Sequence, residues 1–294
     1  MNVVMLGHSN AGKTTYMASM YRDLATQGLQ GFWVRAQQEG DHRRLLSMAN
    51  RVASGKYPRP SDRRHEYALT LRHQGSPVID FHWKDHRGGA LRERSTSGQT
   101  RELLDDLHTA DAILLFLDAP QLARGGRVGA APVRDLTTRV AGALDRRTDP
   151  TPVVVLLTKA DLIDEEEFDA CMRALDAFIN AIRGKQLAFG TVIDVACGPQ
   201  PRNVPVPVLF SLYFGLRLQA EAAHGRTTQA ALVAQQRIAA DTRVRRILGR
   251  FGGRRYDLEA QLATAGFVSE WQALDSLVSP TQALETMLGD VPVF

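Results

Sequence analysis

The sequence predicts an α/β fold of three layers, with a mostly parallel, six-stranded sheet between two layers of helices. Two uninterrupted apolar runs, 112–117 and 153–157, are typical of strands that are buried on both faces of a parallel sheet. Residues 3–6 form a shorter run of the same kind. Helical stretches at about 100–110, 133–147 and 165–183 follow or separate the later strands, which is the order of a sheet with helical crossovers.

A hairpin interrupts this parallel pattern. Residues 65–71 and 78–83 alternate between apolar and other side chains, and a turn containing Gly-Ser-Pro separates them. We expect the strand at 65–71 to run antiparallel at one edge of the sheet, and residues 191–196 to supply the sixth strand. Residues 28–64 are expected to hold an inserted helix, around 45–52, followed by a loop.

The chain is expected to divide into two parts. Residues 1–215 hold all the predicted strands, whereas residues 216–294 show apolar residues at helical intervals, among them Trp271, Leu274 and Val278. A helical C-terminal extension is therefore predicted from about residue 216. Its apolar stripe either packs on the first part or binds a partner protein.

Composition excludes few functions but indicates a compartment. The 36 basic and 32 acidic residues give a formal net charge of +4, which by itself indicates no nucleic-acid partner. Cys171 and Cys197 lack metal-ligand spacing and suit a reducing environment. Because no apolar run is long enough to span a bilayer and no basic leader precedes the first strand, we expect a cytoplasmic protein without membrane insertion.

The most informative segment follows the first predicted strand and fits Gly-x-x-x-x-Gly-Lys-[Ser/Thr]. It comprises, in order, Gly7, His8, Ser9, Asn10, Ala11, Gly12, Lys13 and Thr14, with Thr15 next in the predicted helix. Such a loop wraps backbone N–H groups around phosphate oxygens at the positive end of a helix dipole. Lys13 would reach the β- and γ-phosphates, and the Thr14 hydroxyl would ligate Mg²⁺. The segment therefore predicts a nucleoside triphosphate site.

A second pattern, Asp-x-x-Gly, follows the hairpin and consists of Asp85 and Gly88. In this position Asp85 would hold Mg²⁺ through a water molecule, and the Gly88 N–H would contact the γ-phosphate. The alternative is a polar strand end followed by a glycine turn, because the pattern alone is common.

A third pattern, [Asn/Thr]-Lys-x-Asp, ends the strand at 153–157 and consists of Thr158, Lys159 and Asp161. A carboxylate here can accept hydrogen bonds from both N1–H and the 2-amino group of guanine, which adenine does not offer. Lys159 would lay its aliphatic stem on the purine. The alternative is a helix start in which Asp161 is the N-cap.

In combination, the three patterns resemble the TRAFAC class of Ras-like P-loop GTPases, particularly prokaryotic stand-alone members, over residues 1–215. The resemblance implies the P-loop NTPase sandwich, binding of GTP and GDP with Mg²⁺, and hydrolysis of GTP involving Lys13, Asp85 and Gly88. It also implies that the loop after the last strand meets the guanine. Ala196 and Cys197 occupy that place, where the class usually has Ser-Ala.

Three positions bear on hydrolysis. Gly89 replaces the water-positioning glutamine of the class, so slow unaided turnover is predicted. Ser61 is the first candidate for the switch residue that closes over Mg²⁺, with a solvated loop as the alternative. Asn10 occupies the position that coordinates K⁺ in potassium-activated members, and an asparagine suited to the loop backbone is the alternative.

We therefore predict a Mg²⁺-dependent GTP-binding protein with slow hydrolysis, a nucleotide-controlled switch that works with an unidentified protein effector or activator. One alternative is a recruitment module that binds GTP or GDP without hydrolysis. The other is an ATPase in which Asp118, at the end of a buried strand, is the Walker B residue. Arginines between 243 and 255 could bind nucleic acid, but a solvated helix end is the simpler interpretation. The sequence indicates no oligomeric state.

Overall fold

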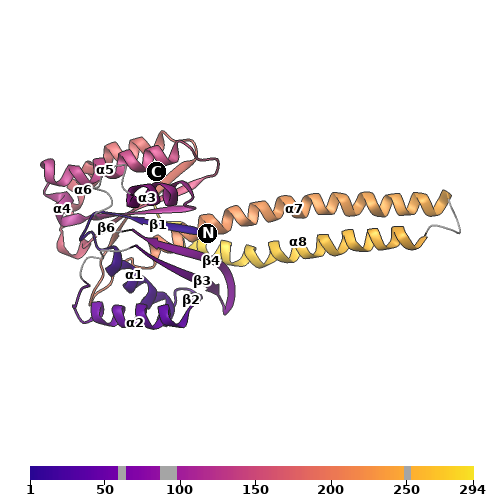
Figure 1. Ribbon diagram of the computed structural model, residues 1–294, viewed down its shortest axis with the longest axis horizontal. Helices are drawn as coiled ribbons and strands as arrows, with labels where there is room; N and C mark the ends of the chain where they lie inside the picture. Colours follow the sequence, from indigo (N-terminus) through magenta and orange to yellow (C-terminus); the bar gives the residue numbers. More distant parts are fainter. Residues whose placement is uncertain (59–63, 87–97, 248–252) are drawn as a thin grey trace. The chain divides into compact units, whose positions relative to one another are not determined.

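The computed structural model describes residues 1–58, 64–86, 98–247 and 253–294 (Figure 1). Its strands are β1 (Asn2–Leu6), β2 (Phe32–Ala36), β3 (His65–His73), β4 (Ser76–Asp85), β5 (Ala112–Asp118), β6 (Thr151–Thr158) and β7 (Ala188–Val195). Its helices are α1 (Lys13–Arg22), α2 (Glu39–Ala53), α3 (Gly98–His108), α4 (Ala119–Ala123), α5 (Gly126–Leu144), α6 (Glu165–Arg183), α7 (Val206–Ile247) and α8 (Gly253–Leu288), with a π-helical turn η1 (Asp23–Gln27) and a 3₁₀ turn η3 (Ala160–Leu162).

The strands form one sheet in the order β2-β3-β4-β1-β5-β6-β7. β1 pairs in parallel with β4 and β5, and β6 pairs in parallel with β5 and β7. Helices α1 and α2 lie on one face of the sheet, and α3, α4, α5 and α6 lie on the other (Figure 1). The predicted three-layer, mostly parallel α/β fold is confirmed.

The sheet differs from the prediction at one edge. It has seven strands rather than six, because β2 lies inside the segment expected to hold only a helix and a loop. Phe32, Val34 and Ala36 of β2 are buried, whereas Trp33 and Arg35 between them are exposed. Since β2 pairs outside β3, the antiparallel strand β3 lies second from the edge and not at it. The inserted helix is present as α2.

The β3–β4 hairpin is tighter than predicted and carries Asp85 to the end of β1. Its turn consists of Gln74 and Gly75, whose φ angles of 50° and 86° suit the left-handed turns that join twisted antiparallel strands. The 10-residue strand β4 then ends at Asp85, directly opposite Met5 of β1. The register of two strands thus brings Asp85 next to the loop that follows β1.

One hydrophobic core of the fold lies between the sheet and the helices α3 to α6. Every residue of β6 is buried, as are all residues of β5 before Asp118, and these strands pack with apolar residues of α3, α5 and α6. The predicted helix at 165–183 is confirmed as α6. It begins after Asp164, whose carboxylate accepts a hydrogen bond from the Glu167 backbone N–H at 2.9 Å in a capping box.

Two compact units make up the chain. The first consists of Met1–Leu212 together with Leu288–Phe294, and the second of Tyr213–Met287. Within the first unit, Phe294 forms two backbone hydrogen bonds with Gly190 of β7, of 2.7 and 3.0 Å. The last residues of the chain therefore belong to the unit that contains the sheet.

The second unit contains most of α7 and α8, which lie side by side and run antiparallel (Figure 1). An ion pair of 2.9 Å joins Arg226 of α7 to Glu270 of α8. Helix α7 runs without a break through residue 216, where the C-terminal extension was expected to begin. None of the described helices combines the length and the apolar character needed to cross a bilayer.

Candidate functional site

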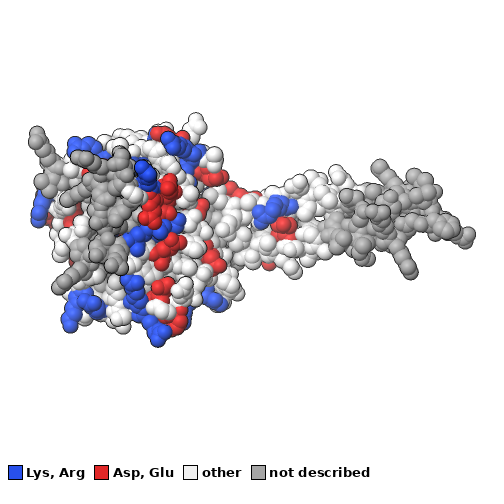
Figure 2. All heavy atoms as spheres, viewed as in Figure 1, with Lys and Arg blue, Asp and Glu red and all other residues white. Residues whose placement is uncertain are grey.

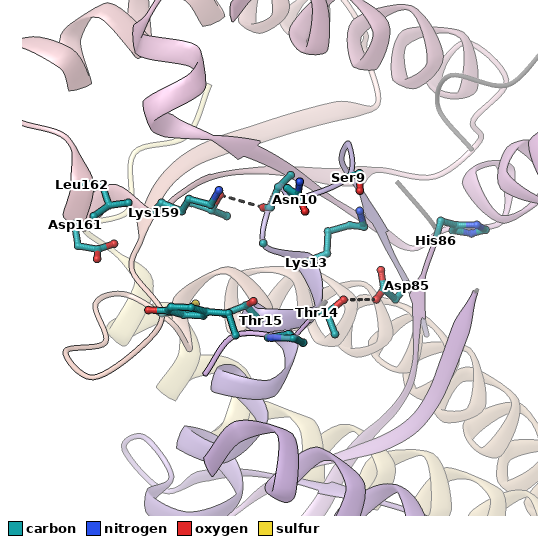
Figure 3. A pocket seen from close by; sticks show the side chains of 16 residues that line it. Ser9, Asn10, Lys13, Thr14, Thr15, Asp85, His86, Lys159, Asp161 and Leu162 are labelled. Atoms are coloured by element: carbon teal, nitrogen blue, oxygen red, sulfur yellow. Dashed lines mark hydrogen bonds between the residues drawn. The ribbon is translucent and has the colours of Figure 1, made fainter. Parts of the chain in front are cut away.

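A cavity of about 580 Å³ opens where β1, β4, β6 and β7 end (Figure 3). Its size falls in the range of small-molecule sites. It is lined by Ser9, Asn10, Ala11, Gly12, Lys13, Thr14, Thr15, Tyr57, Pro58, Asp85, His86, Thr158, Lys159, Asp161, Leu162 and Cys197. The three sequence patterns, which lie far apart in the chain, thus meet around one cavity.

Most of the predicted site residues line this cavity, but not all. Gly7 and His8 begin the phosphate loop without lining the cavity, and Ala196 is buried beside it. Gly88, Gly89 and Ser61 lie outside the described residues, so their predicted roles stay predictions.

Two glycines give the phosphate loop its course. Gly7 passes so close to β5 that an added Cβ would lie 2.7 Å from the Phe116 carbonyl oxygen. Gly12 has a φ of 82°, in the left-handed region, immediately before α1 begins at Lys13. No side chain in the described part of the chain caps the start of α1, so its first N–H groups can serve an anionic ligand.

Lys13 and Asp85 are buried, oppositely charged groups at one end of the cavity. Lys13 is 7% exposed, and its Nζ donates a hydrogen bond of 2.7 Å to the Gly7 carbonyl oxygen. Asp85 is 1% exposed, and its Oδ2 accepts a hydrogen bond of 3.4 Å from the Thr14 hydroxyl (Figure 3). Burial lowers the pKa of Lys13 and raises the pKa of Asp85 to about 6, and each group's charge partly offsets the shift of the other.

The surroundings of Asp85 fit the predicted magnesium ion. Its Oδ1 atom is buried and has no hydrogen-bond partner among the described residues. Buried carboxylates without partners are costly, and a hard divalent cation bound by carboxylate and hydroxyl oxygens removes that cost. Thr14 and Asp85 would hold the ion. These contacts favour the ligand role of Asp85 over that of a solvated strand end.

The opposite end of the cavity is built by the loop after β6. Thr158 Oγ1 lies 3.0 Å from the carbonyl oxygens of both Ala11 and Leu117, so β6 is tied to the phosphate loop and to β5. Asp161 lies in η3, is exposed, and faces the cavity from the end opposite Lys13 (Figure 3). The N-cap of the following helix is Asp164, so the interpretation of Asp161 as that cap is wrong.

Asp118 has a structural role at the edge of this loop. One carboxylate oxygen accepts a hydrogen bond of 3.1 Å from the Gln121 backbone N–H and caps α4, and the other pairs with the Lys159 ammonium. Asp118 does not line the cavity, whereas Asp85 contacts Thr14 inside it. These contacts favour a role of Asp118 in orienting Lys159 over the Walker B role of the ATPase alternative.

The loop after β7 completes the end of the cavity that holds Asp161, which we call the base end after its predicted role. Cys197 lines the cavity, and burial raises the pKa of its thiol to about 12, so the thiol stays neutral. Tyr57 also lines the cavity and touches this loop, since a Cβ added to Gly198 would lie 2.8 Å from its hydroxyl. Sequence reasoning missed Tyr57, although it belongs to the segment in which Ser61 was singled out.

A charged cluster lies next to the end of the cavity that holds Lys13 and Asp85, which we call the phosphate end after its predicted role. Asp106 of α3 lies 2.7 Å from Lys84, 2.8 Å from Arg64 and 2.8 Å from His86. Burial opposes ionisation of Asp106, but the hydrogen bond from Lys84 and the charges of Arg64 and His86 outweigh it and lower the pKa of this carboxyl. No sequence pattern marks this cluster, because its members are spread over more than forty positions.

Surface charge is mixed. Acidic and basic side chains alternate over the described part of the face in Figure 2. This face therefore has no continuous basic surface among the described residues, in line with the modest net charge.

The fold and the patterns gathered at this cavity define the chain as a P-loop GTPase. More particularly, the family Double-GTPase 2 matches residues 2–190, and the chain belongs to that family. The predicted relationship to the P-loop GTPases is thus confirmed. No protein of curated function matches the chain.

Several solved structures are similar in fold. A bacterial selenocysteine-specific elongation factor EF-Sec is 14% identical, with a TM-score of 0.38 over 67% of this chain and 25% of its own. This chain therefore spans only about a quarter of the elongation factor. The SRb subunit of the Chaetomium thermophilum signal recognition particle receptor, in its complex with GTP and SRX, is 13% identical, with a TM-score of 0.41 over 72% of this chain and 96% of its own. The small GTPase Arl6 of Trypanosoma brucei is 12% identical, with a TM-score of 0.35 over 73% and 94%.

Proposed function

We propose that the chain binds GTP together with Mg²⁺, hydrolyses it slowly, and acts as a switch whose state depends on the bound nucleotide. The observation that carries this proposal is one cavity with two chemically different ends. Lys13 and the buried, partly unpartnered Asp85 stand at one end, and the exposed carboxylate of Asp161 stands at the other.

Each end has a defined task in this proposal. Lys13 and the N–H groups at the start of α1 bind the phosphates, while Asp161 accepts the hydrogen bonds of guanine. Thr14 and Asp85 hold Mg²⁺, which when bound neutralises charge on the β- and γ-phosphates. Lys159, held by Asp118, presents its stem to the purine.

Slow turnover follows from the sequence at position 89. Gly89 has no side chain that could orient the attacking water, so we propose unaided rates on the order of the 10⁻⁴–10⁻² s⁻¹ of unassisted switch GTPases. A protein activator that supplies the missing group would raise this rate.

Phosphate release under multiple-turnover conditions tests the proposal. The wild type should release phosphate from GTP slowly, with Mg²⁺ required, and should leave ATP intact. Asp85→Asn should bind GTP without the Mg²⁺ requirement and without turnover. Turnover of ATP at a similar rate would contradict guanine selectivity, and tight GTP binding with no release at all would favour the non-hydrolysing recruitment module.

We further propose that the second unit binds the partner protein. Val268, Trp271 and Val278 of α8 are 45%, 55% and 38% exposed, so this helix offers apolar surface that a partner could cover. Trp271→Ser should abolish binding of a partner captured with the GTP-loaded protein and leave nucleotide affinity unchanged. Exposed Gln272→Ser on the same helix is the matched control. Equal partner binding by both variants would exclude this surface.

A further inference from the structure

Arg202, in the loop between β7 and α7, hydrogen-bonds within its own loop to Ala196 and across to Ala160 in the loop after β6. Its own backbone pairs with Ala196 through two hydrogen bonds, of 3.0 and 3.1 Å. This pair closes the turn that contains Cys197 and fixes one side of the base end. Arg202 does not line the cavity, so it acts on a ligand only through other residues.

The side chain of Arg202 reaches the other loop. Its Nη2 donates a hydrogen bond of 3.1 Å to the carbonyl oxygen of Ala160, the residue immediately before Asp161. Ala160 is buried in η3 and directly precedes Asp161. Its position therefore sets the backbone position from which the exposed Asp161 side chain extends. A single residue thus joins the turn that contains Cys197 to the turn that contains Asp161.

Asp194 orients the guanidinium for this contact. Its Oδ2 lies 3.0 Å from Arg202 Nη2, and its Oδ1 accepts a hydrogen bond of 3.0 Å from Asn203. Because Asp194 belongs to β7, the ion pair anchors the Arg202 guanidinium to a strand of the sheet and not to another loop. Planar guanidinium groups are suited to holding a carboxylate and a carbonyl oxygen at the same time.

We propose that Arg202 is a positioning residue for base recognition, which sets the distance between the Asp161 turn and the Cys197 turn and thereby the affinity for guanine. This inference rests on the proposed pairing of Asp161 with guanine. An exposed ion pair of this kind adds little to folding stability, so its contribution should appear in nucleotide selectivity.

Calorimetric titration of the full chain in Mg²⁺ tests the proposal with three probes: a non-hydrolysable GTP analogue, the matching ATP analogue, and inorganic tripolyphosphate, which has no base. Arg202→Ala keeps the backbone pair with Ala196 and removes only the side-chain link. We expect this variant to lower the affinity for the GTP analogue about tenfold, which corresponds to the upper contribution of one hydrogen bond. The affinity for tripolyphosphate should change less than about twofold, because the phosphate end does not contact Arg202.

Two further variants separate positioning from folding. Asp194→Asn keeps the Arg202 side chain but removes the charge that orients it. It should lower the affinity for the GTP analogue about threefold, a fraction of the same hydrogen-bond contribution. Arg217→Ala is the matched control, since its side chain is 54% exposed in an ion pair, as against 53% for Arg202, and it should change nothing.

The outcomes distinguish this proposal from the proposed function. Unchanged affinity of Arg202→Ala for the GTP analogue would overturn the positioning role, and so would an equal loss for tripolyphosphate, which would indicate a general structural defect. A wild type that binds both nucleotide analogues equally would overturn the pairing of Asp161 with guanine and the role of Arg202 with it.

Discussion

The two ends of the cavity are constructed differently. At the phosphate end, Lys13 and Asp85 are almost completely buried and are placed by the pairing of two core strands, β1 and β4. At the base end, Asp161 and Leu162 are exposed, and contacts between loops hold them. The difference teaches that phosphate binding depends on the integrity of the core, whereas base recognition can be altered without disturbing the fold.

The largest effect is expected at the phosphate end. Lys13→Ala should lower the affinity for a non-hydrolysable GTP analogue by more than about 100-fold, because it removes a buried charge-assisted contact to the phosphates. Calorimetric titration measures this. Lys185→Ala, which breaks a surface ion pair with Asp145, is the control and should bind normally. Affinity near that of the wild type in Lys13→Ala would exclude the phosphate-loop assignment.

Substitution of the charged residue at the base end, Asp161, should alter the preference of the site among purine bases. Asp161→Asn should bind GTP about 100-fold more weakly, since two hydrogen bonds to a charged acceptor are lost, and should bind xanthosine triphosphate more tightly. Competition between the two nucleotides measures the exchange. Asp164→Asn, three residues further along, affects only the cap of α6 and should leave the preference for guanine intact. If both variants behave alike, Asp161 does not read the base.

Substitutions beside the phosphate end should also lower the folding stability of the protein. Asp106→Ala leaves Lys84 and His86 without their carboxylate behind the phosphate end, and should lower the free energy of unfolding by about 2–3 kcal/mol. The neighbouring exposed Asp105→Ala should cost less than about 0.5 kcal/mol. Denaturant unfolding measures both. A loss no larger than that of the control would show that the cluster does not stabilise this end.

The same cluster predicts a pH dependence. Because the pKa of Asp106 is lowered in the folded state, its stabilisation is complete above the ordinary value of 3.8 and is lost as the pH falls through the lowered folded-state pKa. The difference in unfolding free energy between the wild type and Asp106→Asn should therefore be constant at neutral pH and shrink in strongly acidic solution. A difference that grows on acidification would refute the sign of this shift.

The smallest effect concerns Asn10. Its φ of 68° lies in the left-handed region, which asparagine tolerates better than most residues, so backbone geometry alone accounts for it. If Asn10 also binds K⁺, single-turnover hydrolysis should be faster in K⁺ than in Na⁺ by less than about tenfold, equivalent to 1.4 kcal/mol. Asn10→Gly keeps the backbone angle accessible and should abolish that response. Equal rates in both salts would exclude the cation.

The phosphate end could be predicted from the sequence because its chemistry is local. Eight consecutive residues encode the phosphate loop, and the apolar runs that became β5 and β6 are long enough to identify. The start of α6 was also readable, since Asp164 and Glu167 form a capping box in sequence.

The base end and the sheet edge were less accessible. β2 has five residues, too few to stand out, although Phe32 and Val34 alternate with Trp33 and Arg35 in the way that an edge strand requires. Arg202 has no motif because it acts through the carbonyl oxygen of another loop. Contacts that use the backbone of a distant residue leave no pattern along the chain.

The pairing of Phe294 with Gly190 bears on self-association. β7 is an edge strand, and exposed edges offer unpaired N–H and C=O groups to strands of other molecules. Phe294 occupies these groups at Gly190, the Asn203 side chain bonds to the Asp194 carbonyl oxygen, and Arg202 pairs with Ala196 just beyond the strand. Phe294 and the loop that follows β7 thus occupy part of this edge, which leaves fewer of its groups free for the edge-to-edge addition that leads to aggregation.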